Sequence, residues 1–239
     1  LLIAIGTKDN EYQTVAIDTA TNTFSLIIDI NTPDAAYMYI SSKSLPGEEL
    51  RVPIFIPAKS TSASTNIKVG NTITATMNDQ NSQAIISYIS GYLKPLFDNY
   101  KPINILLPAI TTGADSISMT MTNRDAIDYL QYYANLNRAI VTTRLRQSNY
   151  KIPSEAIVNC PTAQDLVMMP GLKYFREATA PLVIQEIAIG SNLENRLNRV
   201  KAAVADTALI SIIERQLIEQ DRIDSYSRVG GEMPDVPII

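Results

Sequence analysis

The 239-residue chain contains no histidine, no tryptophan and only one cysteine. Without imidazole it cannot run a Ser-His-Asp or Cys-His mechanism, use histidine as a general base, or build the usual zinc site. The single cysteine, Cys160, excludes a disulfide within the chain, so we expect packing alone to hold the fold. With no imidazole to activate it, Cys160 is interpreted as a partly buried thiol rather than a nucleophile.

Charged residues are scarce as well. They make up 18% of the chain, below the roughly one quarter of a typical soluble domain, whereas 46% of the residues are hydrophobic. The formal net charge of −4 gives no overall attraction to a phosphate backbone, so nucleic acid is disfavoured as a partner. No run reaches the roughly 18 apolar residues of a membrane span, so we predict no transmembrane segment. A polar but mostly uncharged surface fits a virion or extracytoplasmic protein at least as well as a cytosolic enzyme.

Sequence fingerprints of nucleotide and calcium sites are missing too, so we predict no cofactor and no metal. The segment Ser148–Lys151 has the S-x-x-K spacing of serine acyl transferases. It precedes Pro153 instead of opening a helix, and its companion motifs are absent, so we interpret it as a chance match. Asp125 and Asp128 could bind a cation or act as acid and base, but acids in a first helical turn mainly complement the helix dipole. We therefore predict no catalytic residue.

Basic residues cluster near tyrosines in the middle of the chain. The cluster comprises Arg138, Arg144, Arg146 and Lys151, near Tyr132, Tyr133 and Tyr150. It could follow a nucleic-acid backbone with stacking support. Because the chain as a whole is acidic, a solvated helix end or an interface patch is the favoured interpretation.

Residues 1–77 are predicted to form a β-rich domain. Runs of β-branched and aromatic residues predict strands at residues 23–30, 35–40, 50–57 and 71–77. The polar tract at residues 59–66 is predicted to be an exposed loop or arm. Pro53 and Pro57 each remove a ladder donor, so their strand is expected at a sheet edge, where Ile54 and Ile56 could meet a neighbouring chain. The chain begins without Met or a basic leader region, and we expect that a leader or a longer upstream part has been removed.

Residues 78–190 are predicted to be a mixed α/β region. Helical spacing and capping residues predict three helices: one from near Asn81 to Pro95, one capped by Thr122 or Asn123 and ending before Pro153, and a short one capped by Thr162. Prolines predict extended connections across residues 99–121, with a strand at residues 116–121, and a further strand is predicted at residues 181–189.

Residues 191–239 are predicted to form one long amphipathic helix followed by an extended tail. Ser191 and Glu194 form a capping box, and neither Gly nor Pro follows until about Ser227. Nearly forty helical residues would span about 55 Å, whereas a compact chain of this length measures roughly 45 Å across. The apolar stripe should therefore pack on other chains.

Together these features predict an α+β fold and an interface with other chains. The predicted contact residues are Leu197, Val200, Val204, Ile212, Ile213 and Leu217 on the long helix, Ile54 and Ile56 on the edge strand, and Ile238 and Ile239 in the tail. The expected partners are further copies of the chain and other structural subunits.

The favoured function is a non-catalytic structural subunit of a large multi-chain assembly. Two settings fit equally: a virion component such as a phage capsid, neck or tail protein, or an extracytoplasmic component of an envelope-spanning secretion or conjugation machine. A monomeric ligand-binding module is the alternative. A carboxylate-based hydrolase is less favoured, because the chain lacks the tryptophan platforms that usually hold sugars.

Overall fold

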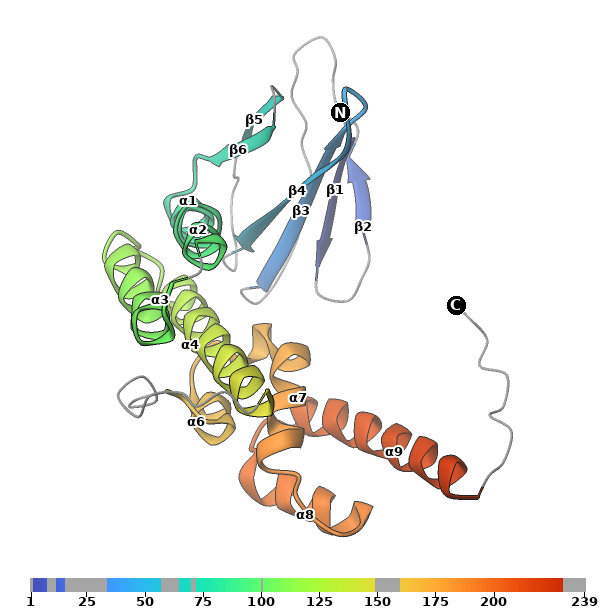
Figure 1. Ribbon diagram of the computed structural model, residues 1–239. Helices are drawn as coiled ribbons and strands as arrows, with labels where there is room; N and C mark the ends of the chain where they lie inside the picture. The colour runs from blue at the N-terminus through green and yellow to red at the C-terminus, as the bar shows by residue number, and fades with distance from the viewer. Residues whose placement is uncertain are drawn as a thin grey trace. The chain divides into compact units, whose positions relative to one another are not determined.

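The structure, a computed structural model, describes residues 2–7, 12–15, 34–56, 65–69, 72–99, 101–148 and 160–229. The fold is α+β, as predicted: short antiparallel strands occupy the N-terminal part, and helices make up most of the rest (Figure 1). The chain divides into two compact units. Unit 1 comprises Leu1–Ala134 with Pro153–Ala156, and unit 2 comprises Asn135–Ile152 with Ile157–Ile239. The boundary between them falls inside helix α4 (Arg124–Gln147).

Unit 1 contains a four-stranded antiparallel sheet of order β2-β1-β3-β4. Its strands are β1 (Leu2–Thr7), β2 (Tyr12–Val15), β3 (Asp34–Ser42) and β4 (Leu45–Ile56). β3 and β4 confirm the strands predicted at residues 35–40 and 50–57. β4 lies at an edge of the described sheet, as its proline predicted, because an edge strand tolerates the missing N–H of Pro53.

A second antiparallel pair joins β5 (Thr65–Val69) to β6 (Ile73–Met77). β6 confirms the strand predicted at residues 71–77, whereas β5 begins inside the predicted loop of residues 59–66. The strand predicted at residues 23–30 and the residue Pro57 lie outside the described residues.

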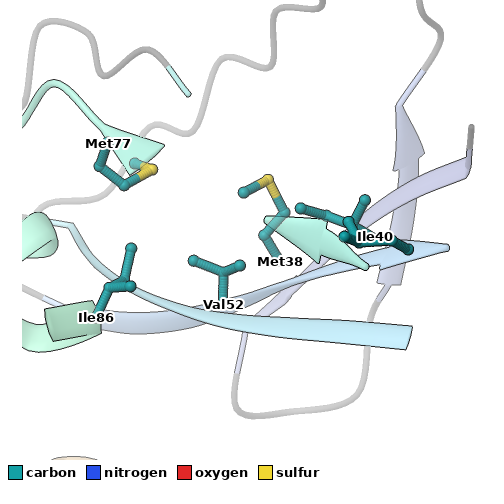
Figure 2. Packing of buried hydrophobic residues seen from close by; sticks show 6 residues of the cluster. Met38, Ile40, Val52, Met77 and Ile86 are labelled. Carbon is teal, nitrogen blue, oxygen red and sulfur yellow. The ribbon is translucent and has the colours of Figure 1, made fainter. Parts of the chain in front are cut away.

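One hydrophobic cluster of unit 1 lies between the strands and the first helix, α1 (Gln80–Ile86). Met38 and Ile40 alternate along β3 with the half-buried Tyr37 and Tyr39, as the two-residue period of a strand requires. Figure 2 shows this cluster, in which β3, β4, β6 and α1 each contribute at least one side chain. Its buried members are Met38, Ile40, Val52, Ile73, Met77 and Ile86.

The helix predicted from near Asn81 begins there but does not end at Pro95. Asp79 caps α1 by accepting a hydrogen bond from the Ser82 N–H at 2.6 Å. A π-helical stretch, η1 (Ser87–Leu93), and a short helix, α2 (Lys94–Asp98), continue the run. In a regular α-helix the Pro95 ring would clash with the carbonyl of Gly91, and we attribute the wider π turn to this conflict.

The extended segment predicted at residues 99–121 is wrong, as is its strand at residues 116–121. Residues Ile103–Ser118 form helix α3, with Pro108 inside it. Its buried positions recur at helical spacing: Leu106, Leu107, Ile110, Gly113 and Ala114. Pro108 is exposed, so water can reach the backbone carbonyl that its missing N–H leaves unpaired.

Helix α4 begins as predicted, since the Asn123 side chain accepts a hydrogen bond from the Ala126 N–H at 3.1 Å. In unit 2, Thr162 caps the short helix α6 (Ala163–Met168), which was also predicted. A single 3₁₀ turn, η2 (Leu172–Tyr174), follows it. The strand predicted at residues 181–189 is wrong, because Arg176–Glu186 form helix α7 and bury Leu182 and Val183 on one side.

The single long helix predicted from residue 191 is wrong as well. It is divided into α8 (Leu193–Ala203) and α9 (Thr207–Val229), and Val204 between them is in an extended conformation. Asn192, rather than Ser191, caps α8 by accepting a hydrogen bond from the Asn195 N–H at 2.9 Å. Asp206 accepts a hydrogen bond from the Leu209 N–H at 2.8 Å and so begins α9.

Candidate functional site

An ion pair fixes the joint between α8 and α9. The guanidinium of Arg176 donates two hydrogen bonds to the carboxylate of Asp206. Its Nε lies 2.9 Å from Oδ1, and an amino nitrogen lies 2.8 Å from Oδ2. Burial opposes the charge of Asp206, but hydrogen bonds from Arg176 and from the Leu209 N–H outweigh it and lower the pKa of this carboxyl. The same carboxylate thus caps α9 and ties the start of that helix to α7.

Most of the predicted contact residues in this region are covered by their own chain. Val200, Val204, Ile213 and Leu217 are buried, and Leu197 and Ile212 are half-buried. α9 packs against α7 and α8 within unit 2. The buried members of this set therefore belong to the core of unit 2 and are not free to contact other chains.

The predicted edge-strand contact is partly occupied by the same chain. Ile54 is half-buried and packs on the core cluster of unit 1. The Ser82 hydroxyl of α1 donates to the Phe55 carbonyl of β4 at 3.3 Å. One end of the edge is therefore engaged by α1. The Ile56 side chain and the tail residues Ile238 and Ile239 lie outside the part that the structure describes.

The C-terminal part of α9 is different, because its described side chains are exposed, although Gln220 accepts a hydrogen bond from Arg196 of α8. Its buried side chains end at Leu217, and every residue from Ile218 to Ser225 is exposed. Ile218 and Ile223 are 49% and 50% exposed. We call residues Ile218–Val229 the α9 extension; its twelve residues measure about 18 Å. Sequence reasoning missed this boundary, although Gln220 and Asp224 continue the buried face of Ile213 and Leu217 as polar residues.

Three of the residues considered for catalysis have structural partners. Asp128 pairs with Arg124 at 3.1 Å near the start of α4. The Ser148 hydroxyl donates to the Leu145 carbonyl at 2.9 Å, and Lys151 is not among the described residues. Cys160 is half-buried, with its sulfur 2.8 Å from the Thr142 hydroxyl.

Among the described residues, no group of three or more His, Cys, Asp or Glu side chains could hold a metal ion. Of the helices that the structure describes, none combines the length and the apolar character needed to cross a bilayer.

The basic cluster predicted around α4 does not form one surface. Arg144 and Arg146 are exposed near the end of the helix, whereas Arg138 is 8% exposed. The Nε atom of Arg138 is buried and has no hydrogen-bond partner. Tyr132 is fully buried, and Tyr150 lies outside the described residues. A stacking platform beside exposed arginines is therefore not observed in this part of the chain.

The fold thus defines an α+β protein whose bulk is helical. Comparisons with protein-family models, curated proteins and solved structures each found no match to this chain.

Proposed function

We propose that the chain is a non-catalytic structural subunit of a large multi-chain assembly. The α9 extension is the observation that carries this proposal. An isolated helix of about twelve residues is marginal in water, and the side chains described beyond Leu217, from Ile218 to Ser225, are all exposed. Packing against neighbouring subunits would supply the missing stabilisation.

The positions of the two exposed isoleucines favour more than one neighbour. Ile218 and Ile223 are five residues apart, so they point about 140° away from each other around the helix axis. One flat partner surface cannot cover both. A helix inserted between two neighbouring subunits would bury both isoleucines and leave Glu219 and Arg222, which pair at 2.7 Å, at the rim.

Two settings remain for such an assembly: a virion, or an extracytoplasmic part of an envelope-spanning secretion or conjugation machine. The low charge content and the small net charge of −4 support both equally. An electron micrograph of the native particle from which the chain is purified would separate them.

The proposal is tested by placing charges on the α9 extension. We expect the purified chain to self-associate or to copurify with a larger particle, as measured by size-exclusion chromatography with light scattering. Replacing both exposed isoleucines, Ile218→Asp with Ile223→Asp, should abolish that association and leave the circular dichroism spectrum unchanged. The matched control is Ile189→Asp, which charges another exposed isoleucine of unit 2.

A wild-type chain that stays monomeric at about tens of micromolar, with no larger particle in its preparation, would contradict the proposal. That result would favour the monomeric ligand-binding module instead. Equal loss of association in the Ile189→Asp control would show that added charge, and not the α9 extension, is responsible.

A further inference from the structure

Arg138 is the most buried arginine whose surroundings the structure describes. It is 8% exposed, and its Nε atom has no hydrogen-bond partner. Among the ion pairs of the described residues, none includes Arg138. An arginine side chain stays charged in proteins, and it is almost never fully buried without a paired anion. The charge of Arg138 is therefore uncompensated in the described part of unit 2.

Two other arginines of unit 2 show what ordinary compensation looks like. Arg176 holds Asp206 through two nitrogens, and Arg196 donates to the Ala188 carbonyl at 3.1 Å and to Gln220 at 3.2 Å. Both are more exposed than Arg138. Burial makes an unpaired charge more costly. Arg138, the most buried of these three arginines, therefore needs a partner more than the other two do.

Buried residues on either side of Arg138 in α4 are apolar or carry a hydroxyl group, and the Cys160 thiol donates to the Arg138 carbonyl. Leu136 and Ala139 on α4 are each 2% exposed. One helical turn further on, Thr142 is buried and lies 2.8 Å from the Cys160 sulfur. The carboxylate of Glu186 is engaged elsewhere, since it accepts hydrogen bonds from the Ala163 N–H and the Thr143 hydroxyl.

We propose that Arg138 is a recessed binding site for a small oxyanion, a phosphate or a carboxylate. Such an anion accepts two parallel hydrogen bonds from one edge of the guanidinium, which would satisfy Nε and neutralise the buried charge together. The apolar surroundings strengthen this interaction relative to water. This site does not depend on the proposed assembly role, because it lies on α4 and not on α9.

The test uses thermal unfolding of the whole chain in a concentration series of inorganic phosphate, with sodium chloride at the same ionic strength as reference. A parallel series with acetate separates a carboxylate from a phosphate source. We expect a saturable rise in Tm of about 3 °C or more with the preferred ion. Arg138→Gln should abolish the rise. Arg144→Gln, which removes an exposed arginine of the same helix, should retain it.

The stability of the Arg138→Gln variant without phosphate or acetate distinguishes a structural role of Arg138 from an anion site. In chloride alone, Arg138→Gln should be at least as stable as wild type, because it removes an unpaired buried charge. Arg138→Lys keeps the charge but lacks the planar fork, so it should bind the anion more weakly; it serves as the reporter if Arg138→Gln does not fold.

Two outcomes overturn the proposal. The first is a wild-type chain that shows no saturable response to either ion. The second is an equal response in wild type and in both the Arg138 and Arg144 variants, which would mean general screening of surface charge.

Discussion

Asp206 carries two structural tasks with one carboxylate. It caps α9 through the Leu209 N–H and pairs with Arg176 of α7. The cap determines where α9 begins, and the ion pair attaches the start of α9 to α7. Both tasks need the ionised form, since a carboxylate accepts all of these hydrogen bonds.

We expect Asp206→Ala to lower the free energy of unfolding by about 1–3 kcal/mol, because it removes both the cap and the partner of Arg176. Asp206→Asn keeps a capping side chain and removes only the charge, so its loss should be smaller. The measurement is urea unfolding followed by circular dichroism. Equal stability of Asp206→Ala and wild type would contradict this account of the joint.

The same carboxylate makes the free energy of unfolding depend on pH, and the direction follows from its lowered pKa. Its pKa is lowered in the folded chain, so its contribution to stability is present above the unfolded value of about 3.9 and is lost as the pH falls through the lower folded value. The difference in unfolding free energy between wild type and Asp206→Asn should therefore shrink below about pH 4. A difference that stays constant or grows with acidification would contradict the assignment.

Gly113 makes room for an aromatic ring in unit 1. A Cβ atom at this position would overlap the Tyr92 ring, whose hydroxyl donates to the Ala109 carbonyl at 2.9 Å. We expect Gly113→Ala to destabilise the chain by about 1–3 kcal/mol, since this overpacking outweighs the higher helix propensity of alanine. In a Tyr92→Ala background the same change should be neutral or stabilising. A double-mutant cycle measured by urea unfolding checks both expectations.

Among the helices, the sequence errors have different causes. Pro108 was given too much weight: it occupies the sixth position of α3 and is exposed, so only one backbone bond is lost and water compensates it. Pro181 occupies the same position in α7, where apolar β-branched residues predicted a strand. Asp206 was given too little weight, although an aspartate followed by a helical run is an ordinary helix start. Strands β3, β4 and β6 were predictable because turn residues and β-branched runs agreed there.

The candidate contact surface was only partly predictable for a related reason. A repeating apolar stripe identifies a buried face but does not tell which chain buries it. Val200, Ile213 and Leu217 were therefore recognised as apolar contacts, and their partner proved to be their own unit. The unpaired Nε of Arg138 depends on tertiary placement and leaves no sequence signal.

Two consecutive residues of α9 separate the core from the exposed extension. Leu217 is fully buried, and Ile218 is 49% exposed. We expect Leu217→Ala to lower the free energy of unfolding by about 2–5 kcal/mol, and Ile218→Ala to change it by about 0.5 kcal/mol or less in the dissociated chain. Urea unfolding at low protein concentration checks the pair. Similar losses at both positions would mean that the core continues past Leu217.

For the molecule as a whole, the division into two compact units predicts that a destabilising substitution acts mainly within its own unit. Gly113 and Leu217 lie in different units, so their variants should raise hydrogen exchange in different segments. We expect Gly113→Ala to lower protection mainly in η1 and α3, and Leu217→Ala mainly in α7 and α9. Mass spectrometry of peptic peptides resolves these segments. If either variant instead lowered protection equally along the whole chain, the two units would unfold as one cooperative body, and a local change at a subunit contact would be transmitted through all of it.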